Sequence, residues 1–156
     1  MKSNELIIYN FEEIRRRSIK VWQEIPQNLL VWKPDEQALS MKEMIRHVLD
    51  SEHYYHLCIK NRGSLSFYQS PFENRSFVSV EDELQFSQRY RKDFLATVKA
   101  FTEEELSDIQ IDRSDVGYVR SLGDMLLRVA YHEAVHTGQM LDYLRTADVK
   151  RANIWD

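Results

Sequence analysis

The residues best suited to chemistry in this sequence are two histidines four positions apart, His132 and His136. Residues at positions i and i+4 of a helix share one face with their Cβ atoms about 5–6 Å apart, so both imidazoles can reach one divalent metal ion. Apolar residues lie on roughly the same side of this predicted helix. Two imidazoles among them cost free energy unless a metal ion or a hydrogen-bond partner satisfies them. We interpret the pair as half of a metal site, with ordinary core or surface histidines as the alternative.

A site with three protein ligands needs one more donor, and the predicted helix over residues 40–61 supplies His47, His53 and His56. With about 100° between successive helical residues, His56 lies near the centre of the apolar face and His53 points away from it. By the same reasoning His47 lies about 120° from the centre of that face. Periodicity alone favours His56, but the spacing does not decide which residue is the third ligand.

Two other metal-binding patterns compete for the histidine pair. The string His132-Glu133-x-x-His136 matches the helix of zincin proteases, in which the glutamate is the general base. However, Gln139 and Asp142 replace the glycine and histidine of the longer metzincin motif, and no clear edge strand precedes the helix to hold a peptide. A di-iron bundle needs two Glu-x-x-His pairs, and this chain has one. The protease is therefore the less favoured alternative, and the di-iron site is weaker still.

Four amphipathic stretches must position these histidines. The chain has only 4 Gly and 3 Pro, and its long uninterrupted stretches repeat apolar residues at helical rather than strand spacing. Ser40, Ser79 and Ser121 are predicted to cap three of the helices, each with an acidic residue three positions later. The sequence therefore predicts an all-α four-helix bundle with helices near residues 4–25, 40–61, 79–102 and 121–146.

The connections carry further information about the bundle. Residues 64–79 contain aromatic side chains without a sustained period, and this connection is longer than neighbouring helices need. It can cross an end of the bundle and let the second and third helices run parallel. Thr102 and Glu105 predict a short extra turn, and the alternation of residues 109–119 around Asp115-Val116-Gly117 predicts a small hairpin or extended loop.

Length, charge and cysteine usage limit the classes of function. A chain of 156 residues with 43% hydrophobic and 29% charged residues is expected to form a single domain over residues 1–156. A net charge of −4 without a long basic run argues against a nucleic-acid or anionic-membrane partner. Cys58 is the only cysteine, which excludes an intramolecular disulfide and favours a small buried residue. With no apolar segment near the roughly 18 residues of a membrane span, we expect a cytoplasmic protein.

The order and spacing of several strings resemble the DinB superfamily of small four-helix bundles, which includes YfiT-like and thiol-S-transferase branches. The resemblance covers about the whole chain. The strings that carry it are Trp32-x-Pro34, Ser40-Met41-Lys42-Glu43-Met44-Ile45-Arg46-His47-Val48, Ser51-Glu52, Ser121-Leu122-x-Asp124-Met125-Leu126, His132-Glu133-Ala134-Val135-His136-Thr137-Gly138-Gln139-Met140 and Tyr143-Leu144-Arg145.

The resemblance implies one divalent metal ion held by His47, His132 and His136, and so favours His47 over His56 as the third ligand. Three neutral imidazoles with an open position suit zinc or nickel and do not exclude iron or manganese. Gln139 is placed to orient a ligand or the bound water. Glu133 would at most assist proton transfer.

The resemblance also implies a function and an assembly. It favours S-transfer of a low-molecular-weight thiol to a small electrophile, with a non-catalytic metal-binding or stress-response protein as the alternative. It further suggests a homodimer. One departure concerns the C-terminal segment, where Thr146-Ala147-Asp148-Val149 replaces the glycine and proline-containing tail of many relatives.

Overall fold

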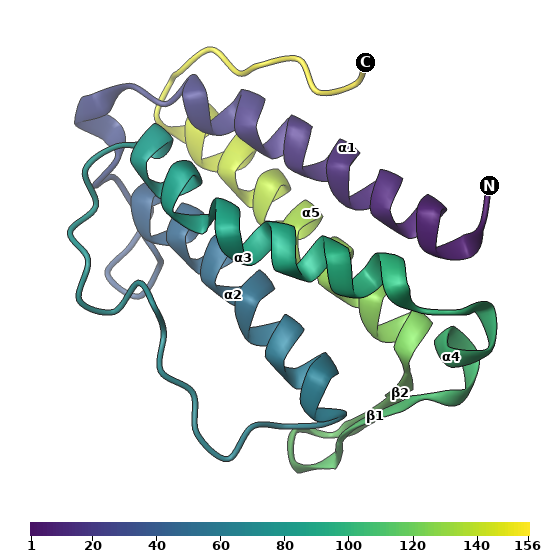
Figure 1. The fold of residues 1–156 in the computed structure, drawn as a ribbon. Coiled ribbons are helices and arrows are strands. Elements are labelled where there is room, and N and C mark those ends of the chain that lie inside the picture. The colour runs from purple at the N-terminus through teal and green to yellow at the C-terminus, as the bar shows by residue number, and fades with distance from the viewer.

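Four long helices form the frame of the protein in a computed structural model that describes residues 1–156 (Figure 1). They are α1 (Ser3–Gln23), α2 (Met41–Asn61), α3 (Val80–Ala100) and α5 (Leu122–Thr146). The predicted bounds agree with these to within two residues. The prediction of a four-helix bundle is therefore confirmed.

Local capping explains why three of these helices begin where they do. The Ser40 hydroxyl accepts a hydrogen bond from the Glu43 backbone N–H, and the Glu43 carboxylate accepts one from the Ser40 N–H at 2.8 Å. Ser79 and Ser121 cap α3 and α5 through their hydroxyl oxygens alone, without the reciprocal carboxylate bond of the α2 cap. Each cap satisfies a backbone donor that the first helical turn leaves without a partner.

The helices are arranged as two parallel pairs. In Figure 1, α1 and α5 run in one direction, and α2 and α3 run in the opposite direction. Around the bundle α1 packs against α5, α5 against α2, α2 against α3, and α3 against α1. The connection over residues 62–79 therefore runs along the length of the bundle rather than across one end, and the predicted parallel course of α2 and α3 is confirmed.

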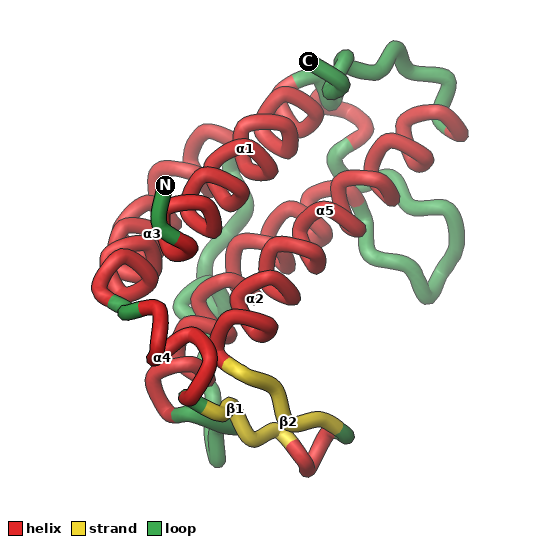
Figure 2. The backbone as a smooth tube through the Cα atoms, turned by 90° about the vertical axis from the view of Figure 1, so that its right-hand side faces the viewer, coloured by secondary structure: helices red, strands yellow, loops and turns green.

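Short elements cover one end of the bundle, opposite the C-terminal segment (Figure 2). They are the short helix α4 (Glu103–Asp108), the strand β1 (Gln110–Arg113), a 3-10 turn (Ser114–Val116) and the strand β2 (Tyr118–Ser121). The strands pair antiparallel, and Gly117 makes the turn possible with a φ of 94°. The predicted hairpin is present, but it ends two residues later than expected because β2 runs directly into the α5 cap.

The interior has two apolar regions with a charged layer between them. One region, which includes Phe94 and Leu126, lies toward the hairpin, and the other, which includes Trp22 and Met140, lies toward the opposite end. Each long helix contributes one buried charged residue to the layer between them, only 5–9% exposed. These four residues, which we call the charged layer, are Arg15 of α1, Glu52 of α2, Arg91 of α3 and Glu133 of α5.

Direct ion pairs hold the charged layer together. Arg15 donates two hydrogen bonds to the Glu133 carboxylate, at 2.7 and 2.9 Å, and a third to Glu52 at 3.2 Å. Arg91 pairs with Glu52 and also donates to the carbonyl oxygen of Phe11 at 2.9 Å. Two guanidinium groups therefore neutralise two carboxylates at a point where all four helices meet.

The rest of the chain adds three observations. The segment after α5 runs back along α1, where Arg17 donates to the Ile154 carbonyl at 2.9 Å and Lys20 pairs with Asp156. Cys58 is fully buried, as predicted. No helix combines the length and the apolar character that crossing a bilayer requires.

Candidate metal centre

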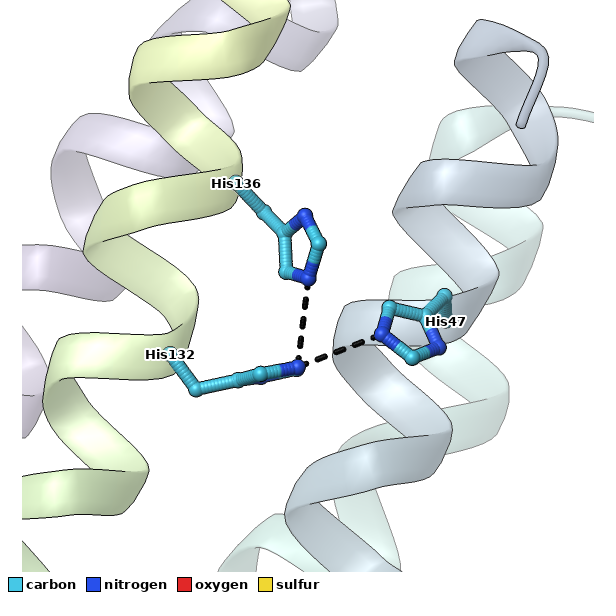
Figure 3. Close-up of side chains that lie close together, drawn as sticks. All are labelled: His47, His132 and His136. Atoms are coloured by element: carbon cyan, nitrogen blue, oxygen red, sulfur yellow. Dashed lines mark hydrogen bonds between the residues drawn. The ribbon is translucent and has the colours of Figure 1, made fainter. Parts of the chain in front are cut away.

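Three imidazole rings converge between α2 and α5 (Figure 3). His132 and His136 come from α5 and His47 from α2. The Nε2 atom of His132 lies 3.2 Å from Nε2 of His47 and 3.2 Å from Nε2 of His136. One ring nitrogen of each residue falls within 4.8 Å of the others. The structure therefore brings together the three residues that the resemblance implied.

The packing of α2 explains why His47 reaches α5. The neighbouring residues Met44, Ile45, Val48 and Leu49 are buried in the apolar region that also contains Met140 of α5. His47 lies on the flank of this apolar stripe and stays exposed, while His132 and His136 are half-buried. The site is therefore closed on the side of the bundle and open toward solvent at His47.

The spacing of the nitrogens fits a divalent metal ion. Two imidazole nitrogens that bind one tetrahedral zinc ion at about 2.05 Å lie about 3.3 Å apart. The Nε2 of His132 lies 3.2 Å from that of each of the other two histidines, and all three ligand atoms lie within 4.8 Å of one another. The three-nitrogen donor set is that of catalytic zinc sites, which keep a further position for water or substrate.

Gln139 fixes which nitrogen of His136 can bind a metal. Its carbonyl oxygen, Oε1, lies 2.7 Å from Nδ1 of His136. Because a carbonyl oxygen only accepts hydrogen bonds, Nδ1 must carry the proton, which leaves the Nε2 lone pair directed at the other two histidines. This is the orienting role that the sequence suggested for Gln139.

The surroundings keep two of the imidazoles neutral. Burial, together with the neighbouring His136 and His47, lowers the pKa of His132 to about 4. Burial and His136 also lower the pKa of His47. A neutral imidazole has a free lone pair, so at pH 7 these rings need not lose a proton before they bind a metal ion.

The other histidines of α2 lie outside this cluster. His56, which periodicity favoured, is buried against α3, where its Nε2 lies 2.9 Å from the Thr97 hydroxyl oxygen. The ring of His53 packs against Tyr90, also of α3, with 4.4 Å between the ring centres. Periodicity identified the most buried face of α2, whereas the histidine cluster forms on the flank that faces α5.

The position of His56 predicts a pH dependence of stability. Burial lowers its pKa from 6.5 to about 4, so between these values the unfolded chain binds a proton that the folded protein does not. We expect the thermal midpoint of the metal-free protein to fall as the pH is lowered from 6.5 to 4. Above pH 6.5 His56 should add no further stability, because its imidazole is then neutral in both the folded and the unfolded chain. Calorimetry of His56→Leu should show a flatter profile over this range, and an unchanged slope would contradict the assignment.

The structure places Glu133 away from the imidazoles and in the charged layer. Both of its carboxylate oxygens accept hydrogen bonds from Arg15, and this arginine lowers the pKa of the buried carboxyl. A carboxylate held in this way is not available as a general base. The proton-transfer role suggested for Glu133, and with it the zincin alternative, therefore has no geometric basis.

Sequence comparison then identifies the family. The sequence profile of the DinB superfamily matches residues 10–140. The chain belongs to the DinB superfamily. A DinB-like relative, YjoA of Bacillus subtilis strain 168, is 28% identical over 145 residues, which cover 92% of this chain and 90% of YjoA.

Solved structures of DinB-like proteins share the fold. The crystal structure of YjoA from B. subtilis superimposes with a TM-score of 0.70 at 24% identity and covers 95% of both chains. YfiT from B. subtilis gives a TM-score of 0.77 at 13% identity, over 94% of this chain and 89% of YfiT. A DinB-like protein from Bacillus cereus ATCC 10987 gives 0.75 at 13% identity, over 97% of both chains. YfiT is described as a probable metal-dependent hydrolase with an unusual four-helix bundle topology.

Proposed function

We propose that this DinB protein is a metal-dependent enzyme that transfers a low-molecular-weight thiol to a small electrophile. The observation that carries the proposal is the convergence of ring nitrogens from His47, His132 and His136, in which both distances from His132 match the spacing expected of ligands on one ion. We expect zinc or nickel, and iron or manganese are compatible with the same donors.

Different groups would have different roles at such a site. A zinc or nickel ion held there would supply Lewis acidity, which lowers the pKa of a coordinated water toward about 7 and keeps a coordinated thiol as its thiolate. Gln139 would keep the Nε2 lone pair of His136 available to such an ion by accepting a hydrogen bond from Nδ1. The exposed side at His47 admits the thiol and the electrophile.

Proton transfer in this proposal does not involve Glu133. Its carboxylate is bound by Arg15 inside the bundle. The proton of the thiol therefore leaves to solvent through the open side at His47, the sulfur forms the new bond to the electrophile, and the leaving group departs with the displaced electron pair.

Hydrolysis is a second candidate for the same site. The description of YfiT as a probable metal-dependent hydrolase favours it, because the donor set that activates a thiol also activates water. A metal-binding protein without turnover is the remaining alternative.

A thiol panel tests the proposal. Metal-loaded wild type and His136→Ala are assayed with a generic electrophile and glutathione, bacillithiol, mycothiol, cysteine or coenzyme A. We expect turnover with at least one thiol that depends on the bound metal. Full activity in metal-free His136→Ala would contradict the mechanism. Binding of metal without turnover of any thiol would favour hydrolysis or the non-catalytic alternative.

We also propose that the protein is a homodimer in the cytoplasm, where thiols stay reduced. Exposed apolar side chains of α1 and α5 form one surface, where Leu6 and Tyr9 lie beside Leu127 and all three are more than half exposed. Burying such a surface against a second copy is favourable. We expect sedimentation equilibrium to show a dimer at micromolar concentration that Leu127→Glu dissociates, and a wild-type monomer would contradict the proposal.

A further inference from the structure

A cavity of about 260 Å³ adjoins the histidine cluster. His132 forms part of its wall, together with Arg120, Arg128, Tyr131 and Val135. We propose that this cavity binds an oxyanion, a carboxylate or phosphate group, of the substrate whose reacting atom lies at the three histidines. This inference rests on the proposed function, because it names a chemical feature of the substrate of that site.

Arg128 is a cation without an anionic partner. Its one side-chain hydrogen bond goes to the Tyr55 hydroxyl at 3.1 Å, and its guanidinium carbon lies 4.8 Å from the ring centre of Tyr118. The Tyr55 ring in turn packs edge-on against His132, with 5.7 Å between ring centres. Neutral aromatic groups therefore hold a half-buried positive charge beside a candidate metal ligand, and leave its other N–H donors for a ligand.

Arg120 faces the same cavity with unused donors. It forms one ion pair, from Nη1 to Asp124 at 2.7 Å, while its Nε is buried and has no hydrogen-bond partner. Its Nη2 forms no hydrogen bond, so this group keeps N–H donors for a ligand in the cavity. Arg120 and Arg128 thus present two guanidinium groups to one small space.

A third arginine adds positive charge behind the cavity. Arg113 is buried, and its side chain donates only to neutral groups, namely the hydroxyls of Tyr118 at 2.8 Å, Tyr54 at 2.9 Å and Ser64 at 3.3 Å. The three guanidinium groups surround Tyr118 with one ion-paired carboxylate, that of Asp124, among them.

The contrast with the charged layer shows that this positive charge is not a structural pairing. In the charged layer two arginines meet two glutamates. Here only one of three arginines has a direct ion pair, in a protein whose net charge is −4. Guanidinium groups bind carboxylate and phosphate through paired N–H donors, so an oxyanion is the ligand chemistry that this cavity fits.

Calorimetric titration of the zinc-loaded protein tests the inference. The thiols 3-mercaptopropionate and 2-mercaptoethanol both carry sulfur and differ in charge, while propionate and methyl phosphate carry the anion without the thiol. We expect the wild type to bind 3-mercaptopropionate at least about tenfold more tightly than 2-mercaptoethanol, the factor of one hydrogen bond to a charged group. Arg128→Gln and Arg120→Gln should each remove most of this preference.

Arg89→Gln is the matched control. Arg89 also lies over a tyrosine ring, 4.6 Å from the centre of Tyr90, but on α3 and outside the cavity, so its replacement should leave the preference unchanged. NMR can follow the arginine Nε–H resonances of the wild type during the same titrations. This measurement does not depend on whether a variant folds. The signals of Arg120 and Arg128 should shift when propionate or methyl phosphate is added. The anion that binds with the higher affinity shows whether the site prefers a carboxylate or a phosphate.

The outcomes separate this inference from the proposed function. Equal affinity for the two thiols in the wild type, or the full preference in Arg128→Gln, would overturn the oxyanion site and leave the thiol proposal standing. If propionate or methyl phosphate binds in an Arg128-dependent way, and 3-mercaptopropionate binds no more tightly than propionate, the oxyanion site is supported and the thiol proposal is contradicted. If none of the four compounds binds, the inference is wrong.

Discussion

Replacing Arg15 with methionine is expected to lower the free energy of unfolding by about 3–5 kcal/mol, the usual cost of removing one partner from a buried ion pair. Arg15 binds both oxygens of Glu133 and one of Glu52 where all four helices meet. Without it the Glu133 carboxylate remains buried without a compensating charge, because Arg91 pairs with Glu52. Urea denaturation of the metal-free protein measures the change.

The adjacent arginine provides the control. Arg16 also pairs with acidic residues, Glu13 and Asp156, but at the surface, where its side chain is 40% exposed. Exposed ion pairs contribute little, so Arg16→Met should change the free energy of unfolding by less than about 1 kcal/mol. The double variant Arg15→Met/Glu133→Gln should be more stable than the sum of its single changes predicts, because it removes the uncompensated charge. Equal effects at Arg15 and Arg16 would contradict the role of the charged layer.

Replacing His132 with alanine is expected to abolish stoichiometric metal binding. His132 is the central residue of the cluster, with its Nε2 3.2 Å from that of each partner. Loss of an orienting partner alone lowers metal affinity by about 10–100-fold, so loss of a ligand should cost more than about 100-fold. Elemental analysis after dialysis measures the metal content.

Two further variants make the ligand assignment specific. His53→Ala should retain stoichiometric metal, because His53 packs against Tyr90 and lies outside the cluster. Gln139→Ala should keep the ligands but weaken metal binding by about 10–100-fold, because it removes the hydrogen bond at 2.7 Å that fixes the His136 tautomer. Similar metal content in His53→Ala and His132→Ala would show that the assignment is wrong.

The helices could be predicted from the sequence because the signals that define them are local. The Ser40 capping box, the Ser79 and Ser121 caps and the helical repeat of apolar residues all lie within a few positions of the features they determine. The parallel course of α2 and α3 followed from the length of the predicted connection over residues 64–79. These features do not depend on which helices become neighbours.

The third histidine could not be predicted in this way, because it depends on how two helices pack. Periodicity measures the depth of burial, and by that measure His56 is the better candidate on α2. A metal site that opens to solvent forms instead at the edge between helices, where the exposed His47 meets His132 and His136. Only the order of motifs shared with the DinB superfamily indicated His47.

The charged layer was missed for a related reason. Arg15, Glu52, Arg91 and Glu133 each interrupt an apolar stripe, which is a recognisable signal in the sequence. Their pairing joins four helices, however, so no single helix reveals it. The same arrangement explains why the string His132-Glu133-x-x-His136 does not indicate a zincin here. His132 faces the histidine cluster, whereas the next residue, Glu133, faces the charged layer.

Anomalous diffraction from a crystal of the zinc-loaded protein, recorded at the zinc absorption edge, tests the metal centre most directly. We expect one strong peak per chain at about 2.0–2.1 Å from Nε2 of His47, His132 and His136, with Nδ1 of His136 still bonded to Gln139. A peak bound by His53 or His56, or no peak between α2 and α5, would contradict it.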